Sequence, residues 1–192
     1  MPRRRRVPIV VGIDAGFTAT GLVAVKLHPD RLAVVAVEVV RTQPSGRKRG
    51  VRVADDDAER TTTLFDGVRR FLSHVAAGGA VVELPTGGAQ GARANRCMGM
   101  ATGAVCAAVL AADVPAEWVT PRAVKLAAGG RAAASKAEVA AGARLSLHWD
   151  DVQEQMESLP AIATEHLWDA AGAVLAAQDG TLIGALRRGN AG

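Results

Sequence analysis

Residues 7–21, VPIVVGIDAGFTATG, decide the fold that the sequence predicts. The part through Ile13 consists largely of branched aliphatic residues with no polar alternation, which is typical of a strand buried on both faces of a sheet. Gly16 and Gly21 then indicate a tight turn that leads into a second strand over Leu22–Leu27. The stretch is therefore expected to form a β-hairpin with the carboxylate of Asp14 at its base.

Asp14 allows two interpretations. An aspartate at a turn or at the end of a strand can be satisfied by backbone N–H groups. Alternatively, it can face a cation, because a carboxylate is costly to bury without a partner. Asp14 alone does not decide between them, and the choice depends on whether other carboxylates reach the same place.

The remaining pattern predicts an α/β domain. Three strands come first and form an antiparallel meander, and two later strands join in parallel through crossover helices. The result is a mixed five-stranded sheet with helices on both faces. The later strands are expected at 32–40, 80–84 and 117–120, and the helices at 58–77, 92–112, within 121–145, and at 164–178, with a loop at 42–57.

Length and composition agree with one domain over residues 1–192, with a basic tail at 1–6 and a flexible tail from about residue 180. The two cysteines show no disulfide or zinc spacing, and no segment has the length expected of a membrane span, so the expected location is cytoplasmic. The net charge of +4 and a pI near 9.7 favour a polyanionic partner. The loop residues Arg47, Lys48 and Arg49 are candidates to bind it, although charge runs often only face solvent.

Other potential metal ligands occur at equivalent places. Glu83 ends a short buried strand, as Asp14 does, and His166 and Asp169 lie three residues apart on one face of the last predicted helix, near Glu165. On that helix alone, solvated first-turn residues are the simpler interpretation. Together, however, Asp14, Glu83, His166 and Asp169 would suit two hard divalent cations that support an in-line phosphoryl displacement.

From Val11 to about Gln178 the chain resembles the RuvC-type Holliday junction resolvases of the RNase H-like superfamily. The resemblance lies in an ordered set of motifs: GIDAGFTATG (12–21), VVELP (81–85), TPRAVKLAAGGRAAASKAEV (120–139) and HLWDA (166–170). It implies an RNase H-like fold and a homodimer that nicks four-way DNA junctions symmetrically, in a nucleoid-associated setting. It also implies two Mg²⁺ or Mn²⁺ ions in each active site.

Carried over residue by residue, the resemblance makes Asp14, Glu83 and Asp169 the catalytic carboxylates. His166 takes a fourth position where other members have Asp or His. Basic residues that approach the scissile backbone and the junction correspond to Lys125 and Lys136, together with Arg122. The small-residue helix 92–112 offers a close-packing face for the dimer.

Three departures from the family pattern stand out. Ala15 replaces the usual Pro after the first carboxylate. The stretch LPTGGAQ (84–90) lacks the aromatic residue that often wedges into bases near the junction, which affects the expected junction selectivity. The segment between Lys136 and Asp169 is also longer than usual.

Three alternatives remain open from the sequence. One is a less selective endonuclease of the same fold that acts on branched or flapped DNA. A second is a non-catalytic nucleic-acid-binding module, which would have no physical reason to keep four costly ligands together. The third is an ATP-binding protein of the actin and sugar-kinase superfamily, because DAGFT (14–18) resembles its phosphate-binding turn; that architecture needs two lobes, and 192 residues supply one.

Overall fold

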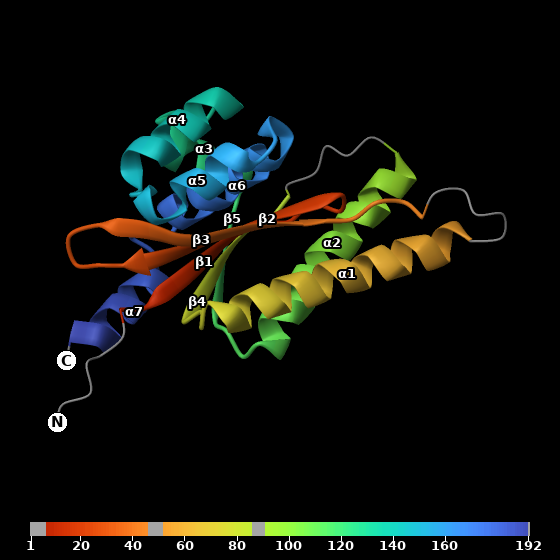
Figure 1. Cartoon of the computed structure of the whole chain (residues 1–192), viewed down its shortest axis with the longest axis horizontal. Coiled ribbons are helices and arrows are strands. Elements are labelled where there is room, and N and C mark those ends of the chain that lie inside the picture. Colours follow the sequence, from red (N-terminus) through yellow and green to blue (C-terminus); the bar gives the residue numbers. More distant parts are fainter. Residues whose placement is uncertain (1–6, 46–51, 86–90, 192) are drawn as a thin grey trace.

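A mixed five-stranded sheet lies between two layers of helices in the computed structural model, which describes residues 7–45, 52–85 and 91–191 (Figure 1). The strand order is β3-β2-β1-β4-β5. The first three strands pair antiparallel, whereas β1 with β4 and β4 with β5 pair parallel. The strands are β1 (Ile9–Asp14), β2 (Ala19–Leu27), β3 (Leu32–Arg41), β4 (Gly79–Glu83) and β5 (Ala116–Val119). The predicted fold class is confirmed.

Helices cover both faces of the sheet, as expected. α1 and α2 pack on one face, and α3, α4 and α6 pack on the other (Figure 1). In β1, Val10 belongs to the core under α6, while Val11 and Ile13 belong to the core under α1 and α2. This arrangement explains why the strand is apolar throughout. The helices are α1 (Val53–His74), α2 (Ala92–Ala111), α3 (Pro121–Gly129), α4 (Lys136–Ser146), α5 (Gln153–Ser158), α6 (Ala161–Ala176) and α7 (Thr181–Ala191), with a 3₁₀ turn, η1, at Asp150–Val152.

Two differences from the sequence prediction concern the start of α1 and the C-terminal tail. α1 begins at Val53 rather than near residue 58, because Asp55 and Asp56 suit the first turn of a helix. Asp57 follows them and is buried, with its carboxylate oxygens 3.1 Å from Arg93 and 2.6 Å from Arg96 of α2. The predicted flexible tail from about residue 180 is wrong, since α7 forms there and Ile183 is fully buried in the core. The basic tail at 1–6 lies outside the described residues.

The segment that the sequence left loosely placed, residues 147–162, runs beside the edge strand β3. His148 forms an isolated parallel bridge with Ala33, and its carbonyl accepts a hydrogen bond from Val34 N at 2.8 Å. Further along, Gln155 Nε2 donates to the carbonyl of Val37 at 2.9 Å. These contacts satisfy backbone groups that an uncovered edge strand would leave open to other chains.

α2 contradicts the expectation that no segment of the chain has the length of a membrane span. In the described part of the chain it is the one helix long and apolar enough, by length and composition, to cross a membrane, with 20 residues and a mean hydropathy of 1.2. Its buried residues, which include Ala101, Val105 and Ala108, form part of the core with α1 and the sheet. A core helix meets the same criteria, so the finding is weak evidence for a membrane span.

Candidate active site

Asp14 and Glu83 lie side by side because of the sheet register. β1 and β4 are neighbouring parallel strands, and Asp14 and Glu83 are paired residues at their carboxyl ends. On the other side of β1, Asp14 pairs with Gly21 of β2. The two carboxylates, which were predicted from separate strands, therefore meet where the parallel strands β1 and β4 end.

Two glycines allow α6 to bring its polar residues to the same edge. A Cβ added to Gly12 would lie 2.0 Å from the carbonyl oxygen of Ala170, and one added to Gly21 would lie 2.2 Å from that of His166. Only glycine fits at so close an approach of helix backbone to strand. The contact fixes α6 across β1 and β2, so that His166 and Asp169 lie above the end of β1.

Asp14 and His166 form a hydrogen-bonded pair. His166 Nδ1 lies 2.7 Å from Asp14 Oδ2, and both side chains are partly buried. When Nδ1 carries the proton and donates it, the lone pair of Nε2 is left available to a metal ion, which is the arrangement that metal-ligating histidines commonly show. The hydrogen bond thus orients His166 and holds Asp14 in place.

Glu83 and Asp169 form the electrostatically unfavourable part of the site. Burial, followed by the nearby charges of Asp14 and Asp169, raises the pKa of Glu83 to about 8. Burial, followed by the charge of Asp14, raises the pKa of Asp169 to about 6. Within the described residues, Glu83 Oε2 is buried and has no hydrogen-bond partner. The two carboxylates therefore lack a counter-charge strong enough to keep both ionised at neutral pH.

Two of the predicted basic residues lie in the same cavity. It has a volume of about 430 Å³, and its lining includes Glu83, Asp169, Lys125 and Lys136. The lysine charges lower the pKa of both carboxyls, although less than burial raises it. Lys136 also forms an ion pair with Glu165 of α6.

The other predicted DNA-binding residues are not placed in this cavity. Arg122 is exposed in the first turn of α3, outside the lining that includes Lys125. Arg47, Lys48 and Arg49 lie outside the described residues. The structure therefore supports a position beside the carboxylates for Lys125 and Lys136 only.

The chemistry of these side chains fits hard divalent cations. Over residues 7–45, 52–85 and 91–191, no three His, Cys, Asp or Glu side chains already stand in a ligating arrangement, and Asp14 and His166 are bonded to each other. The unpartnered Glu83 Oε2 and the raised pKa values nevertheless show a concentration of negative charge that a cation would relieve. Carboxylate oxygens are the ligands that Mg²⁺ prefers, and an imidazole nitrogen suits Mn²⁺ better.

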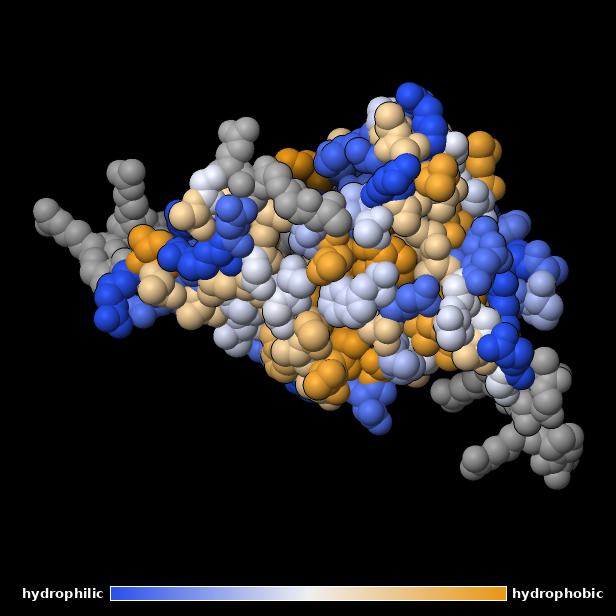
Figure 2. All heavy atoms as spheres, turned by 180° about the vertical axis from the view of Figure 1, so that it is seen from behind, coloured by the Kyte–Doolittle hydropathy of each residue, from blue (hydrophilic) through white to orange (hydrophobic). Residues whose placement is uncertain are grey.

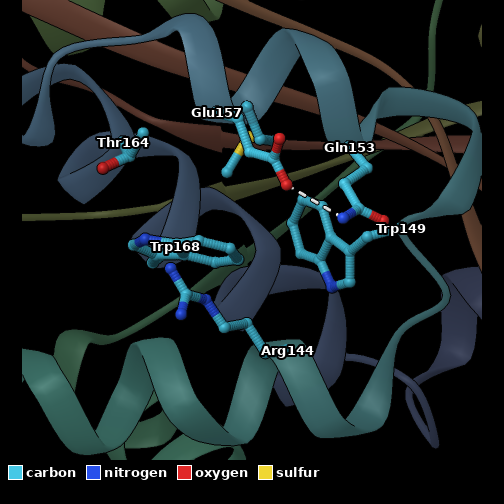
Figure 3. A pocket seen from close by; sticks show the side chains of 7 residues that line it. Arg144, Trp149, Gln153, Glu157, Thr164 and Trp168 are labelled. Atoms are coloured by element: carbon cyan, nitrogen blue, oxygen red, sulfur yellow. Dashed lines mark hydrogen bonds between the residues drawn. The ribbon is translucent and has the colours of Figure 1, made fainter.

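Sequence reasoning missed a second cavity beside α6, which shares no lining residue with the first. It is lined by Arg144, Trp149 and Trp168 with neighbouring residues (Figure 3). The available signal was that two of the three tryptophans in the chain fall within 20 residues of each other. Their convergence depends on the path of residues 147–162, which shows no clear periodicity.

Comparison with known proteins identifies the family. The model of the family "Crossover junction endodeoxyribonuclease RuvC" matches residues 10–165, a range that includes Asp14, Glu83, Lys125 and Lys136 and ends just before His166. A protein of that name from Acidovorax sp. (strain JS42) is 32% identical over 130 residues, which cover 68% of each chain. One from Chlorobaculum parvum is 29% identical over 132 residues, covering 69% of this chain and 65% of its own.

Solved structures agree with the family assignment. Thermus thermophilus RuvC, in complex with a Holliday junction substrate, matches with a TM-score of 0.71 and 28% identity, over 92% of this chain and 96% of that one. The yeast mitochondrial Holliday junction resolvase Ydc2 matches with a TM-score of 0.58 at 10% identity, over 99% and 86% of the two chains, and supports the fold alone. The site, the fold and these matches agree, and the chain belongs to the RuvC family of crossover junction endodeoxyribonucleases.

Proposed function

We propose that this protein is a metal-dependent endonuclease that hydrolyses phosphodiester bonds of four-way DNA junctions at the site formed by Asp14, Glu83, His166 and Asp169. The observation that carries the proposal is Glu83. Its buried Oε2 has no partner among the described residues, and its pKa is raised by burial and by two neighbouring carboxylates. Such a carboxylate is costly to maintain in a purely structural role, whereas a cation-binding site requires it.

Each residue has a distinct role in this proposal. Asp14, Glu83 and Asp169 supply carboxylate oxygens for two Mg²⁺ or Mn²⁺ ions, and His166 supplies a ring nitrogen while its other nitrogen orients Asp14. When bound, such ions activate a water and stabilise the departing 3′-oxygen.

The two lysines act on the substrate from the same cavity. Lys125 and Lys136 line it together with Glu83 and Asp169. We assign to them the binding of the DNA backbone, because a phosphate that approaches the carboxylates needs positive charge beside it. Arg122, which lies outside the cavity, is assigned a contact with DNA further from the scissile bond, and Arg47, Lys48 and Arg49 remain candidates for similar contacts.

Cleavage by Asp14→Asn tests the proposal. The change keeps the size of the side chain but removes a negative ligand, so nicking of a four-way junction in Mg²⁺ should fall by at least about a hundredfold while junction binding in EDTA stays near the parent value. A matched control is Asp66→Asn on α1, on the opposite face of the sheet. Nicking by Asp14→Asn at the parent rate would refute the site.

We further propose a homodimer that places two active sites on one junction. α2 offers the face: Leu110 is 77% exposed and Cys106 is exposed, and a Cβ added to Gly99 or Gly103 would meet nothing within 4 Å. Figure 2 shows hydrophobic side chains gathered toward the centre of the face behind that of Figure 1. Sedimentation of the protein at micromolar concentration measures the state, and a strict monomer in the presence of junction DNA would refute the proposal.

Selectivity for four-way junctions distinguishes the proposed resolvase from a broader branched-DNA nuclease. We infer a preference for four-way junctions, with cleavage in the cytoplasm at the nucleoid. Initial rates on four-way, three-way, flap and duplex DNA of equal length measure it. Equal rates on the flap and the four-way junction would instead favour the broader enzyme.

A further inference from the structure

A buried arginine on α1 takes no part in the nuclease chemistry described above. Arg60 is only 6% exposed, although it carries a charge that is costly to remove from water. Its Nη2 is buried and has no hydrogen-bond partner in the part of the chain that the structure describes. Because arginine is rarely buried so deeply unless it is paired, the groups that Arg60 contacts indicate its role.

Arg60 contacts the turn that joins β1 to β2. Its guanidinium lies over the ring of Phe17, with Cζ 4.3 Å from the ring centroid, and its Nε donates to Oγ1 of Thr42 at 3.1 Å. Thr42 in turn donates from Oγ1 to the carbonyl of Phe17 at 2.6 Å, and from its backbone N to the carbonyl of Thr18 at 3.0 Å. Arg60 and Thr42 therefore hold both the ring and the backbone of this turn.

The turn lies beside the proposed metal ligands. It follows Asp14 directly, since β1 ends at Asp14 and β2 begins at Ala19. It also faces α6, because a Cβ added to Gly16 would lie 3.8 Å from Cε1 of His166. A displacement of the turn would therefore move Asp14 relative to His166 and disturb the 2.7 Å hydrogen bond between them.

An acidic neighbour offsets the charge of Arg60 without using its hydrogen bond. Asp56, which is also buried, accepts hydrogen bonds at 2.7 Å from the backbone N and the hydroxyl of Ser45. These hydrogen bonds hold the pKa of Asp56 below its ordinary value, and the charge of Arg60 acts in the same direction. The hydrogen bond from Arg60 Nε is thus free to go to Thr42, at the end of the turn.

We propose, on the basis of the nuclease function proposed above, that Arg60 is a positioning residue: through Thr42 and Phe17 it fixes the turn between β1 and β2, and the turn fixes Asp14 against His166. Arg60 is too deeply buried to contact DNA itself. Its removal should therefore slow the chemical step and leave junction binding almost unchanged.

The first test compares Arg60→Met with Arg60→Lys. Met removes the charge and the donor, whereas Lys keeps a cation that can lie over Phe17 and donate to Thr42. Single-turnover nicking of a four-way junction in Mg²⁺ should fall about tenfold in Arg60→Met and stay within about threefold of the parent rate in Arg60→Lys. Junction binding in EDTA should stay within about twofold of the parent value in both. Arg69→Met, at an exposed position on α1, is the matched control and should change neither quantity.

Thr42 provides a second comparison that alters no charge. Thr42→Val keeps the size of the side chain but removes the hydroxyl, and with it the hydrogen bonds to Arg60 and Phe17. Thr42→Ser keeps the hydroxyl. Nicking should be about tenfold slower in Thr42→Val and near the parent rate in Thr42→Ser. Equilibrium denaturation of each variant in EDTA establishes that it is folded at the assay temperature.

Hydrogen exchange in the metal-free protein gives a readout that does not depend on cleavage. The Thr42 amide donates to the Thr18 carbonyl, so its protection reports how firmly the turn is held. In Arg60→Met it should exchange at least about tenfold faster than in the parent, while the amide of Val81, which is fully buried in the internal strand β4, changes little. A residue with only a general stabilising role would accelerate exchange at both amides together.

Three outcomes in an active parent would overturn the proposal. The first is nicking by Arg60→Met and Thr42→Val at the parent rate. The second is a loss of rate in Arg60→Lys and Thr42→Ser as large as in Arg60→Met and Thr42→Val. The third is parallel acceleration of exchange at Thr42 and Val81. A parent that does not nick the junction in Mg²⁺ would instead refute the proposed function, and the positioning role of Arg60 with it.

Discussion

Replacing Glu83 by Gln should stabilise the protein in the absence of metal while it abolishes cleavage. Glu83 is partly buried beside Asp14, and its Oε2 has no partner in the described part of the chain. Gln keeps the shape of the side chain but cannot ionise. The variant therefore removes both the electrostatic cost of the site and the negative ligand on which the proposed chemistry depends.

The size of the effect follows from the pKa of Glu83, which burial and the neighbouring carboxylates raise from 4.5 to about 8. Between these values the folded protein keeps a proton that the unfolded chain has released, so stability falls as pH rises. At about 1.4 kcal/mol per pH unit, the loss between pH 4.5 and pH 7.5 is on the order of 4 kcal/mol. Gln avoids this loss, but its amide N–H takes the unpartnered position at a cost of about 1–3 kcal/mol.

Equilibrium denaturation in EDTA at pH 5 and pH 7.5 measures the effect. At pH 7.5, Glu83→Gln is expected to be more stable than the parent by about 1–3 kcal/mol, with the difference reduced or reversed at pH 5. Glu59→Gln, at an exposed position on α1, is the matched control and should change little at either pH. Mg²⁺ should stabilise the parent more than Glu83→Gln, because the parent alone offers all the carboxylates.

The prediction can fail in two ways. A variant that is less stable than the parent at pH 7.5, with the same pH dependence, would mean that Glu83 is already neutralised by a partner. A variant that nicks four-way junctions in Mg²⁺ at a rate near that of the parent would mean that the strained carboxylate has no catalytic use. The first result would refute the electrostatic argument, and the second would refute the catalytic assignment of Glu83.

Substitutions at Lys125, Lys136, His166 and Gly21 test other parts of the site. Lys125→Ala and Lys136→Ala should each weaken junction binding and reduce the slope of log Kd against log salt by about one unit, measured by fluorescence anisotropy; unchanged slopes would remove the lysines from the interface. His166→Asp should retain more cleavage than His166→Ala in both Mg²⁺ and Mn²⁺, and parent-like rates for His166→Ala would exclude it as a ligand. Gly21→Ala should lower thermal stability and slow cleavage at least about tenfold, since its Cβ would lie 2.2 Å from the His166 carbonyl oxygen; Gly103→Ala, whose Cβ meets nothing within 4 Å, should not be destabilising.

The sequence was sufficient to predict the sheet and the meeting of its two carboxylates. Apolar runs without alternation predicted buried central strands, and their order predicted the antiparallel meander followed by parallel pairs. Once β1 and β4 are neighbours, a carboxylate at the end of each must lie beside the other, and the register pairs Asp14 directly with Glu83. The positions of Gly12 and Gly21 also have a structural reason. Their close contacts with α6 explain why small residues occur in strands of otherwise branched residues.

Other features depend on tertiary contacts that leave no periodic signal. Asp57 belongs to α1 because Arg93 and Arg96, more than 30 residues away, neutralise its buried charge. α7 forms where a tail was expected because Ile183 is buried in the core and Glu117 accepts a hydrogen bond from Leu182 N at 3.1 Å. Neither long-range partner can be identified from local sequence.

The structure also shows that the three carboxylates, which the sequence analysis treated as equivalent ligands, have different surroundings. Asp14 has His166 as a hydrogen-bond partner, whereas Glu83 and Asp169 have raised pKa values that the charges of the neighbouring lysines only partly offset. The lysines of the cavity consequently have two competing roles, since the positive charge that partly neutralises the carboxylates is also available to a DNA phosphate.

Because of this competition, Lys136 is expected to affect metal affinity, DNA binding and the pH dependence of cleavage together. Its charge lowers the pKa of Glu83 and of Asp169, so its removal should raise both and weaken metal affinity at neutral pH, in addition to weakening DNA binding. Lys136→Ala should therefore shift the pH dependence of cleavage toward higher pH, because a more alkaline solution is needed to ionise the carboxylates. A lysine that contacts only DNA would change the salt dependence and leave the pH profile unmoved, so measuring both on one variant distinguishes the two roles.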